Sequence, residues 1–188
     1  CVVAAWEGSD PSAAGDTDSR VHGDSSVESG RYRLAVSEVH TYRVALSWSG
    51  STGEGYEQYD RTHQLELPPN APAIVASADP AFRGSDALTN PEQLLLAAAS
   101  SCQMLSFLAI AARSQIDVLS YSDQAEAVMP EDDRPVRITR ITLRPQIVVA
   151  AGSDVERVLR IVEKAHHECY IANSLTSEIV IEPAVSLR

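Results

Sequence analysis

Two cysteine residues, Cys102 and Cys169, are the side chains in this sequence best suited to covalent redox chemistry. A thiolate attacks electrophilic oxygen or sulfur, and two neighbouring thiols can be oxidised to a disulfide. Both cysteines fall in passages that predict helices, each on an apolar stripe. A disulfide needs Cα atoms within about 7 Å, which helices packed with axes about 8–10 Å apart permit along their contact line. The pattern therefore permits a redox pair, and it equally permits two inert thiols in a core.

A reactive thiolate needs a nearby cation, because the pKa of a free cysteine thiol is about 8.5. Cys102 lies roughly three turns inside its predicted helix, too far for the positive end of the helix dipole to act on it. The nearest upstream cation is Arg83, in the loop before the helix, although an ordinary surface arginine is the simpler interpretation. Glu92, in the first helical turn, complements the helix dipole whatever further role it has.

The first half of the predicted domain consists of three strands and a long helix. Alternating apolar residues predict strands at residues 41–48, 56–67 and 72–77, with Tyr42, Val44, Leu46 and Trp48 facing inward. Residues 89–114 predict one long helix. Asn90, Pro91 and Gln93 supply its cap, first position and capping box. Its predicted apolar stripe consists of Leu95, Ala98, Cys102, Leu105, Ala109 and Ala112.

The second half adds strands and one more helix. Residues 115–130 and 134–150 predict a pair of long antiparallel strands, with a bulge between Ile138 and Ile141. Residues 153–169 predict a helix, and residues 176–187 predict a final strand. The stripe of this helix consists of Val155, Val158, Leu159, Val162, Ala165, His166 and Cys169. The order of elements predicts an α+β fold with mostly antiparallel pairing.

Composition limits the classes of function. Apolar residues make up 44% of the 188 positions, and the net charge of −11 disfavours nucleic-acid binding. Uninterrupted apolar runs stay below the length of a membrane span. Three cysteines are too few for a secreted disulfide scaffold, so we predict a cytoplasmic protein. Residues 1–39 are rich in Ser, Asp and Gly and predict a poorly ordered acidic segment, followed by one domain at residues 40–188.

Two passages carry a family resemblance. "TNPEQLLLAAASSC" places a glutamate ten positions before Cys102, and "AHHECYIANSL" contains Cys169. Together they resemble the OsmC/Ohr family of thiol peroxidases, on its OsmC-like side, over about residues 40–187. The resemblance implies an OsmC-like fold and an intertwined homodimer. It also implies that Cys102 attacks the peroxide, that Cys169 resolves the product, and that Arg83 and Glu92 tune the thiolate.

The implied reaction reduces an organic hydroperoxide to an alcohol. Cys102 becomes a sulfenic acid, Cys169 condenses with it, and an external dithiol, a lipoyl protein or a thioredoxin-like protein, reopens the disulfide. We expect no cofactor. Leucines, Met104 and Phe107 predict an apolar surround that favours organic substrates. Tyr170 stands where many relatives have proline, which bears on the choice of reductant.

The predicted distance between Glu92 and Cys102 raises a question about the site. Ten helical residues separate them by about 15 Å along the axis, too far for one arginine to bridge. Either the helix begins later than residue 91, or Arg83 and Glu92 serve the thiol of a partner subunit. We favour the shared site as a hypothesis.

Two other interpretations stay open. The protein could be a dimer that binds an apolar small molecule without catalysis, with structural or redox-sensing thiols. The passage "HHEC", with His166 and His167 close to Cys169, also suggests a metal site. Zinc needs three or four ligands at supporting spacings, and the sequence has neither an HExxH nor a CxxC pattern. We therefore expect no metal here.

Overall fold

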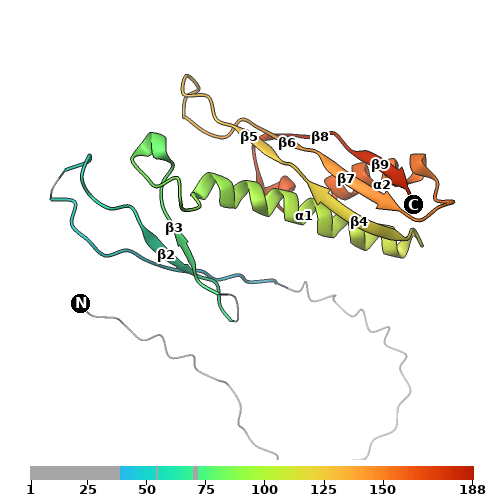
Figure 1. Ribbon diagram of the computed structural model, residues 1–188, viewed down its shortest axis with the longest axis horizontal. Helices are drawn as coiled ribbons and strands as arrows, with labels where there is room; N and C mark the ends of the chain where they lie inside the picture. Colours follow the sequence, from blue (N-terminus) through green and yellow to red (C-terminus); the bar gives the residue numbers. More distant parts are fainter. Residues whose placement is uncertain (1–38, 54, 70–71) are drawn as a thin grey trace, which may run out of the picture. The chain divides into compact units, whose positions relative to one another are not determined.

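The computed structural model describes residues 39–53, 55–69 and 72–188 (Figure 1). The chain divides into two units, Cys1–Thr41 and Tyr42–Arg188. The second unit contains all the helices and strands described below. The predicted acidic segment at residues 1–39 lies outside the described residues, apart from Val39.

The first three strands form a small antiparallel sheet in the order β1-β2-β3. They are β1 (Ala45–Ser47), β2 (His63–Glu66) and β3 (Ile74–Ala76). In this sheet Leu65 lies opposite both Leu46 and Ile74. Each strand lies within its predicted range, but the second is shorter than predicted because residues 56–62 form a turn and irregular chain, and the predicted inward face is wrong. Tyr42 is 89% exposed and Leu46 63% exposed, because no described element of this chain covers them.

Each of the predicted later strands is divided into two shorter ones. They are β4 (Val118–Asp123), β5 (Glu126–Val128), β6 (Arg140–Leu143), β7 (Pro145–Val149), β8 (Glu178–Ile181) and β9 (Ala184–Leu187). They form two three-stranded sheets, β4-β7-β9 and β5-β6-β8. β8 pairs parallel to β6, and β9 pairs parallel to β7. Parallel pairing is possible because a helix between β7 and β8 carries the chain back to the end of the sheet at which β6 begins. Four of the six strand pairs are antiparallel, which confirms the prediction of mostly antiparallel pairing, and the two pairs made by β8 and β9 are parallel.

The break between β6 and β7 falls at Arg144. One carboxylate oxygen of Asp123 accepts the Arg144 backbone N–H at 2.7 Å, and the other accepts the Ser100 hydroxyl at 2.5 Å. The Arg144 N–H is therefore bound to a side chain at the point where the strand passes from one sheet to the other. The bulge predicted between Ile138 and Ile141 is wrong, since the register irregularity lies in β4.

The two helices begin as predicted. α1 (Pro91–Arg113) starts with a complete capping box: the Asn90 side chain accepts the Gln93 N–H at 2.8 Å, and the Gln93 side chain accepts the Asn90 N–H at 3.2 Å. α2 (Val155–His167) is capped by Asp154. Two short 3₁₀ helices, η1 (Pro80–Phe82) and η2 (Ala172–Ser174), lie just before α1 and just after α2.

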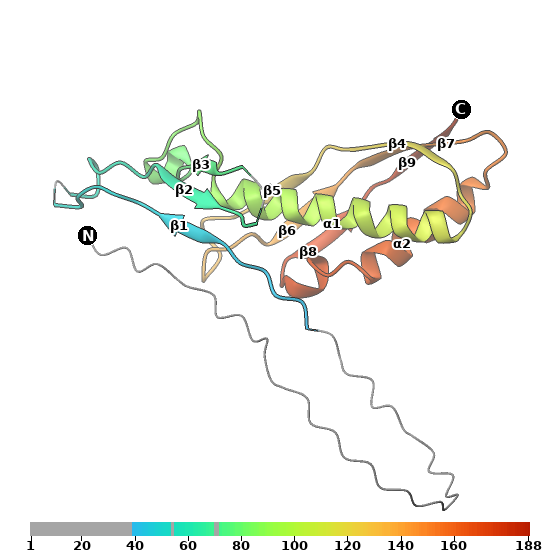
Figure 2. The same ribbon diagram turned by 90° about the horizontal axis from the view of Figure 1, so that it is seen from below.

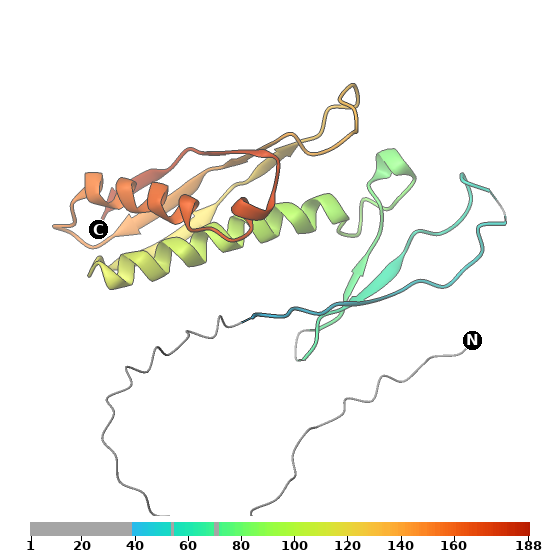
Figure 3. The same ribbon diagram turned by 180° about the vertical axis from the view of Figure 1, so that it is seen from behind.

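Both helices pack side by side against one face of the strands β4–β9 (Figures 2 and 3). The core between them contains Phe107, Ile110 and Ala111 of α1, Ile147 and Val149 of β7, and Val158, Ile161, Val162 and Ala165 of α2.

The predicted apolar stripe of α1 is wrong. Its buried residues are Ala99, Gln103, Phe107, Ile110 and Ala111, and Leu105 on the predicted stripe is 59% exposed. Nearly every position of this helix is apolar or small, so periodicity alone could not identify its inner face.

The hydropathy of α1 is high along most of its length. Its 23 residues include an 18-residue window with a mean hydropathy of 1.9, which by length and composition alone would suit a membrane span. This differs from our expectation, which was based on the shortness of the uninterrupted apolar runs in the sequence. Packing against α2 and β4 accounts for one side of the helix. Only 28% of the window is buried within this chain, so an apolar face of α1 stays uncovered.

Candidate redox site

The structure brings the two internal cysteines together. Cys102 lies in the middle of α1, and Cys169 lies just beyond the end of α2. Both are free thiols, and Cys102 lies close enough to Cys169 to influence the pKa of its thiol. Packing of the two helices therefore brings the two thiols into the same neighbourhood. Their exposure differs: Cys102 is partly exposed, whereas Cys169 is 1% exposed.

Burial makes Cys169 a weak acid. Removal from water is the main cause that raises its pKa to about 11; the neighbouring Cys102 also raises the pKa, whereas the backbone N–H groups of Ala172 and Ile171 lower it. The Ala172 N–H donates to the Cys169 sulfur at 3.5 Å. Cys169 is therefore protonated near neutral pH, and Cys102 is the member of the pair that solvent can reach.

The segment after α2 holds Cys169 in place. The Asn173 N–H donates to the Cys169 carbonyl at 3.0 Å, and the Asn173 side-chain amide donates to the His167 carbonyl at 3.0 Å. The Ser174 hydroxyl donates to the Tyr170 carbonyl at 2.7 Å. The side chains of Asn173 and Ser174 therefore close the turn after α2, and Tyr170 is left 81% exposed.

Cys102 opens into a groove of about 670 Å³. The groove is lined by Tyr42, Ala98, Ser101, Cys102, Leu105, Ser106, Ala109, Ile110, Arg113, Glu168, Tyr170, Ile171 and Asn173. Four residues of the predicted stripe of α1, Ala98, Cys102, Leu105 and Ala109, thus line a groove instead of the core. An apolar surround is present, but neither Met104 nor Phe107 lines it, and Phe107 is fully buried in the core.

Arg83 lies away from the thiols of its own chain. Its Nε atom pairs with the Glu57 carboxylate at 2.8 Å, and both side chains are 58% exposed. It ends η1 in the left-handed conformation, with φ of 65°. Within the described chain Arg83 is therefore paired with Glu57, and no ion pair between Arg83 and Glu92 is formed among the described residues.

Glu92 lies in the first turn of α1, as predicted. One of its carboxylate oxygens, Oε2, is buried without a hydrogen-bond partner in the described part of the chain. Because α1 begins at Pro91, the separation of about 15 Å between Glu92 and Cys102 stands. The alternative of a later helix start is wrong, which leaves the shared site as the hypothesis for Glu92.

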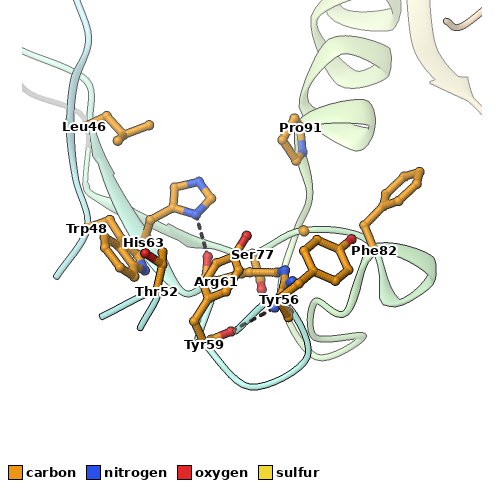
Figure 4. Close-up of a pocket in the computed structure, with 11 residues that line it drawn as sticks. Leu46, Trp48, Thr52, Tyr56, Tyr59, Arg61, His63, Ser77, Phe82 and Pro91 are labelled. Carbon is orange, nitrogen blue, oxygen red and sulfur yellow. Dashed lines mark hydrogen bonds between the residues drawn. The ribbon is translucent and has the colours of Figure 1, made fainter. Parts of the chain in front are cut away.

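Sequence reasoning missed a second arginine. Figure 4 shows Arg61 in a pocket of about 460 Å³, between the first sheet and the start of α1. Its guanidinium lies 3.9 Å from the ring centroid of Tyr59 and 4.7 Å from that of Tyr56. It also donates to the carbonyls of these two residues, at 2.8 Å and 2.6 Å. The signal in the sequence was an arginine that follows two tyrosines in "YEQYDR".

The paired histidines lie apart from the thiols' groove. Their rings are 5.9 Å apart, and Nδ1 of His166 is buried without a partner among the described residues. Burial, and then the neighbouring His167, lower the pKa of His166. The described residues contain no group of three His, Cys, Asp or Glu that could hold a metal ion.

Comparison with known proteins identifies the family. A family model described as OsmC-like protein matches residues 84–184, more than half of the chain. The chain belongs to the OsmC-like protein family. A solved OsmC-like protein of unknown function from Vibrio cholerae is 32% identical, with a TM-score of 0.71 over 78% of this chain and all of that one.

More distant structures share the OsmC-like fold. An organic hydroperoxide resistance protein from Elizabethkingia anophelis is 18% identical, with a TM-score of 0.61 over 81% of this chain and 99% of its own. OhrB of Bacillus subtilis, also named an organic hydroperoxide resistance protein, is 18% identical, with a TM-score of 0.53 over 78% of this chain and 98% of its own. The uncharacterized protein YmaD of Bacillus subtilis is 23% identical over 103 residues, 53% of this chain and 69% of YmaD.

Proposed function

We propose that this OsmC-like protein is a cysteine-based peroxidase that reduces organic hydroperoxides to alcohols. The observation that carries the proposal is that a partly exposed Cys102 in an apolar groove lies near the buried thiol of Cys169. Membership of the OsmC-like family and the names of the two hydroperoxide resistance proteins support it. We expect the protein to act in the cytoplasm, without a cofactor, because the two thiols themselves carry the electrons.

The reaction divides into three steps. The Cys102 thiolate attacks the terminal oxygen of ROOH, the O–O bond breaks, and the alkoxide takes a proton and leaves as ROH, with a sulfenic acid on Cys102. The Cys169 sulfur then attacks that sulfenic sulfur, and its proton leaves with the hydroxyl group as water. An external dithiol reduces the disulfide and is itself oxidised. The high pKa of Cys169 suits this order, because only Cys102 then competes for the peroxide.

The groove favours substrates with a carbon chain. Its walls include Leu105, Ala109 and Ile171. Each CH₂ group of the substrate that is buried there contributes about 0.8 kcal/mol. Hydrogen peroxide has no carbon to bury, so we expect it to react more slowly. The reductant is expected to be a lipoyl protein or a thioredoxin-like protein that reaches the disulfide beside Tyr170.

We further propose a homodimer in which each chain supplies a cation to the thiol of the other. The uncovered face of α1 and the exposed side chains of Tyr42 and Leu46 leave apolar surface for a second copy to cover. The resemblance to intertwined OsmC/Ohr dimers supports this arrangement. Arg83 and Glu92 are the residues that the resemblance implies, and Arg61 offers a second guanidinium that is already held in a pocket.

Stopped-flow mixing of reduced protein with cumene hydroperoxide and with hydrogen peroxide tests the reaction. We expect two of the three thiols of the chain to be lost, faster with the organic peroxide. Cys102→Ser should abolish the reaction, whereas Cys169→Ser should stop at a sulfenic acid that dimedone traps. Indifference of the wild-type protein to both peroxides would refute the proposal.

Mixed dimers test the shared site. Chains carrying Cys102→Ser are combined with chains carrying Arg83→Ala, and in a second experiment with chains carrying Arg61→Ala. Activity regained on mixing identifies the arginine that acts across subunits. If neither mixture regains activity, the site is not shared.

The alternative function, a dimer that binds an apolar small molecule, has one observation in its favour. The pocket around Arg61 has aromatic walls, including Trp48, Tyr56, Tyr59 and Phe82, and contains neither cysteine (Figure 4). Unchanged thiols after treatment with both peroxides, together with saturable binding of an apolar fluorophore that Trp48→Ala abolishes, would favour the binder.

A further inference from the structure

The buried face of α1 contains one polar side chain, Gln103, next to Cys102 in the sequence. It is 1% exposed and lies in line with Ala99 and Phe107, one helical turn away on either side. Its Nε2 atom donates to the Val162 carbonyl of α2 at 3.1 Å. Its Oε1 atom is buried and has no hydrogen-bond partner among the described residues. An apolar side chain would fill this position without the cost of an unpartnered carbonyl, so packing alone does not explain the glutamine.

The hydrogen bond from Gln103 adds direction to an apolar interface. Around it α1 and α2 are held by aliphatic and aromatic contacts, which do not fix rotation or axial slide sharply because the hydrophobic effect is non-directional. The Val162 carbonyl is a single point on α2, so a bond to it specifies both rotation and slide. The other described tie between the helices, from Arg157 to the Ser114 carbonyl at 2.9 Å, is exposed and lies at the far end of α1.

The position of Cys169 depends on where α2 lies. Cys169 follows Val162 by seven residues, two helical turns, and lies beyond the last residue of the helix. Disulfide formation needs Cα atoms within about 7 Å and a restricted torsion about the S–S bond. A slide or rotation of α2 by about 1 Å is enough to spoil such geometry and slow a positioned reaction by up to about 100-fold.

We infer that Gln103 is a positioning residue for the Cys102–Cys169 disulfide, whose side-chain amide sets the register of α2 against α1. The inference rests on the proposed function in that the disulfide is its second step. Gln103 itself touches neither peroxide nor reductant. Its effect is confined to how readily the two sulfur atoms meet.

Equilibration of the protein with glutathione buffers tests the inference without any peroxide. The exchange converts two protein thiols and one glutathione disulfide into the protein disulfide and two glutathione molecules, so its equilibrium constant reports how well the two sulfurs are positioned. We expect Gln103→Leu and Gln103→Met to lower this constant at least tenfold while the reduced protein stays as heat-stable as the wild type. The control Arg157→Gln, which breaks the exposed tie, should leave the constant unchanged.

Single-turnover kinetics add a second readout in the same variants. The bimolecular oxidation of Cys102 by cumene hydroperoxide should keep its rate, and the following closure of the disulfide should slow at least tenfold. A folded Gln103→Leu or Gln103→Met protein with an unchanged glutathione constant overturns the inference. Failure of both variants to fold would also overturn it, because the amide would then serve the core. If the wild-type protein does not react with peroxide, the proposed function is refuted. The equilibrium constant with glutathione would still decide the role of Gln103.

Discussion

The buried thiol of Cys169 should resist alkylation in the folded protein. Its pKa is raised from an ordinary value of 9.0 to about 11, mainly by burial. At pH 8 the thiolate fraction then falls from about one in ten to about one in a thousand, because each pKa unit changes it tenfold. Only the thiolate reacts with iodoacetamide. Native Cys169 should therefore react about 100-fold more slowly than the same residue in protein unfolded by urea.

The assay separates the two internal cysteines after trypsin digestion. Cleavage after Arg83 and Arg113 releases Cys102 in the peptide 84–113, and cleavage after Lys164 releases Cys169 in the peptide 165–188. Reduced protein is pulsed with iodoacetamide between pH 7 and pH 11, and mass spectrometry gives the modified fraction of each peptide. The Cys169 rate should rise about tenfold per pH unit and level off only near pH 11.

A clear result would refute this reasoning. If native Cys169 reacts within tenfold of its urea-unfolded rate at pH 8, its thiol is not the buried weak acid described here.

The raised pKa of Cys169 also has a consequence for stability. The folded chain holds the proton that the unfolded chain releases near pH 9, so the contribution of Cys169 is present below pH 9 and is lost as the pH rises towards 11.

Four further outcomes are expected. Asn90→Ala removes the cap of α1 and should lower the free energy of unfolding by about 1 kcal/mol in urea titrations. Phe107→Ala, which leaves a cavity in the core, should lower the free energy of unfolding by about 3–5 kcal/mol in the same titrations. Gly84→Ala should cost about 3 kcal/mol or more, since its new Cβ would meet the Ala78 carbonyl oxygen at 1.7 Å, whereas the exposed Gly53→Ala should change little. The lowered pKa of His166 means that stability should fall as the pH drops below about 6.5, and thermal melts of His166→Gln between pH 7 and pH 5 should show a smaller fall.

Local signals in the sequence were sufficient to predict where elements begin. Asn90, Pro91 and Gln93 form the predicted capping box because its hydrogen bonds join residues three positions apart. The α+β class followed from the same local patterns, together with the short list of ways in which two helices pack on a sheet. The pairing of Cys102 with Cys169 was only permitted by these patterns and was implied by the family resemblance.

Features set by distant residues were not predictable in this way. Arg144 leaves the strand ladder because the Asp123 carboxylate, 21 residues earlier in the chain, binds its N–H. The inner face of α1 is set by what packs on it, so Leu105 and Phe107 could not be assigned from hydropathy alone. Arg61 was missed for a similar reason, since its environment depends on a turn that folds the rings of Tyr56 and Tyr59 around it.

The anchoring of the chain on both sides of Cys169 limits how far oxidation can alter the molecule. Upstream the thiol follows α2, and downstream Ser177 donates to the Ile138 carbonyl at 2.7 Å and Glu178 N–H to the Thr139 carbonyl at 2.9 Å. Closing the sulfur–sulfur bond can therefore reshape little beyond the short stretch at residues 168–176. Under the proposed function, a reducing protein would have to distinguish the disulfide form from the dithiol form through contacts with that stretch. The ring of Tyr170 is highly exposed there.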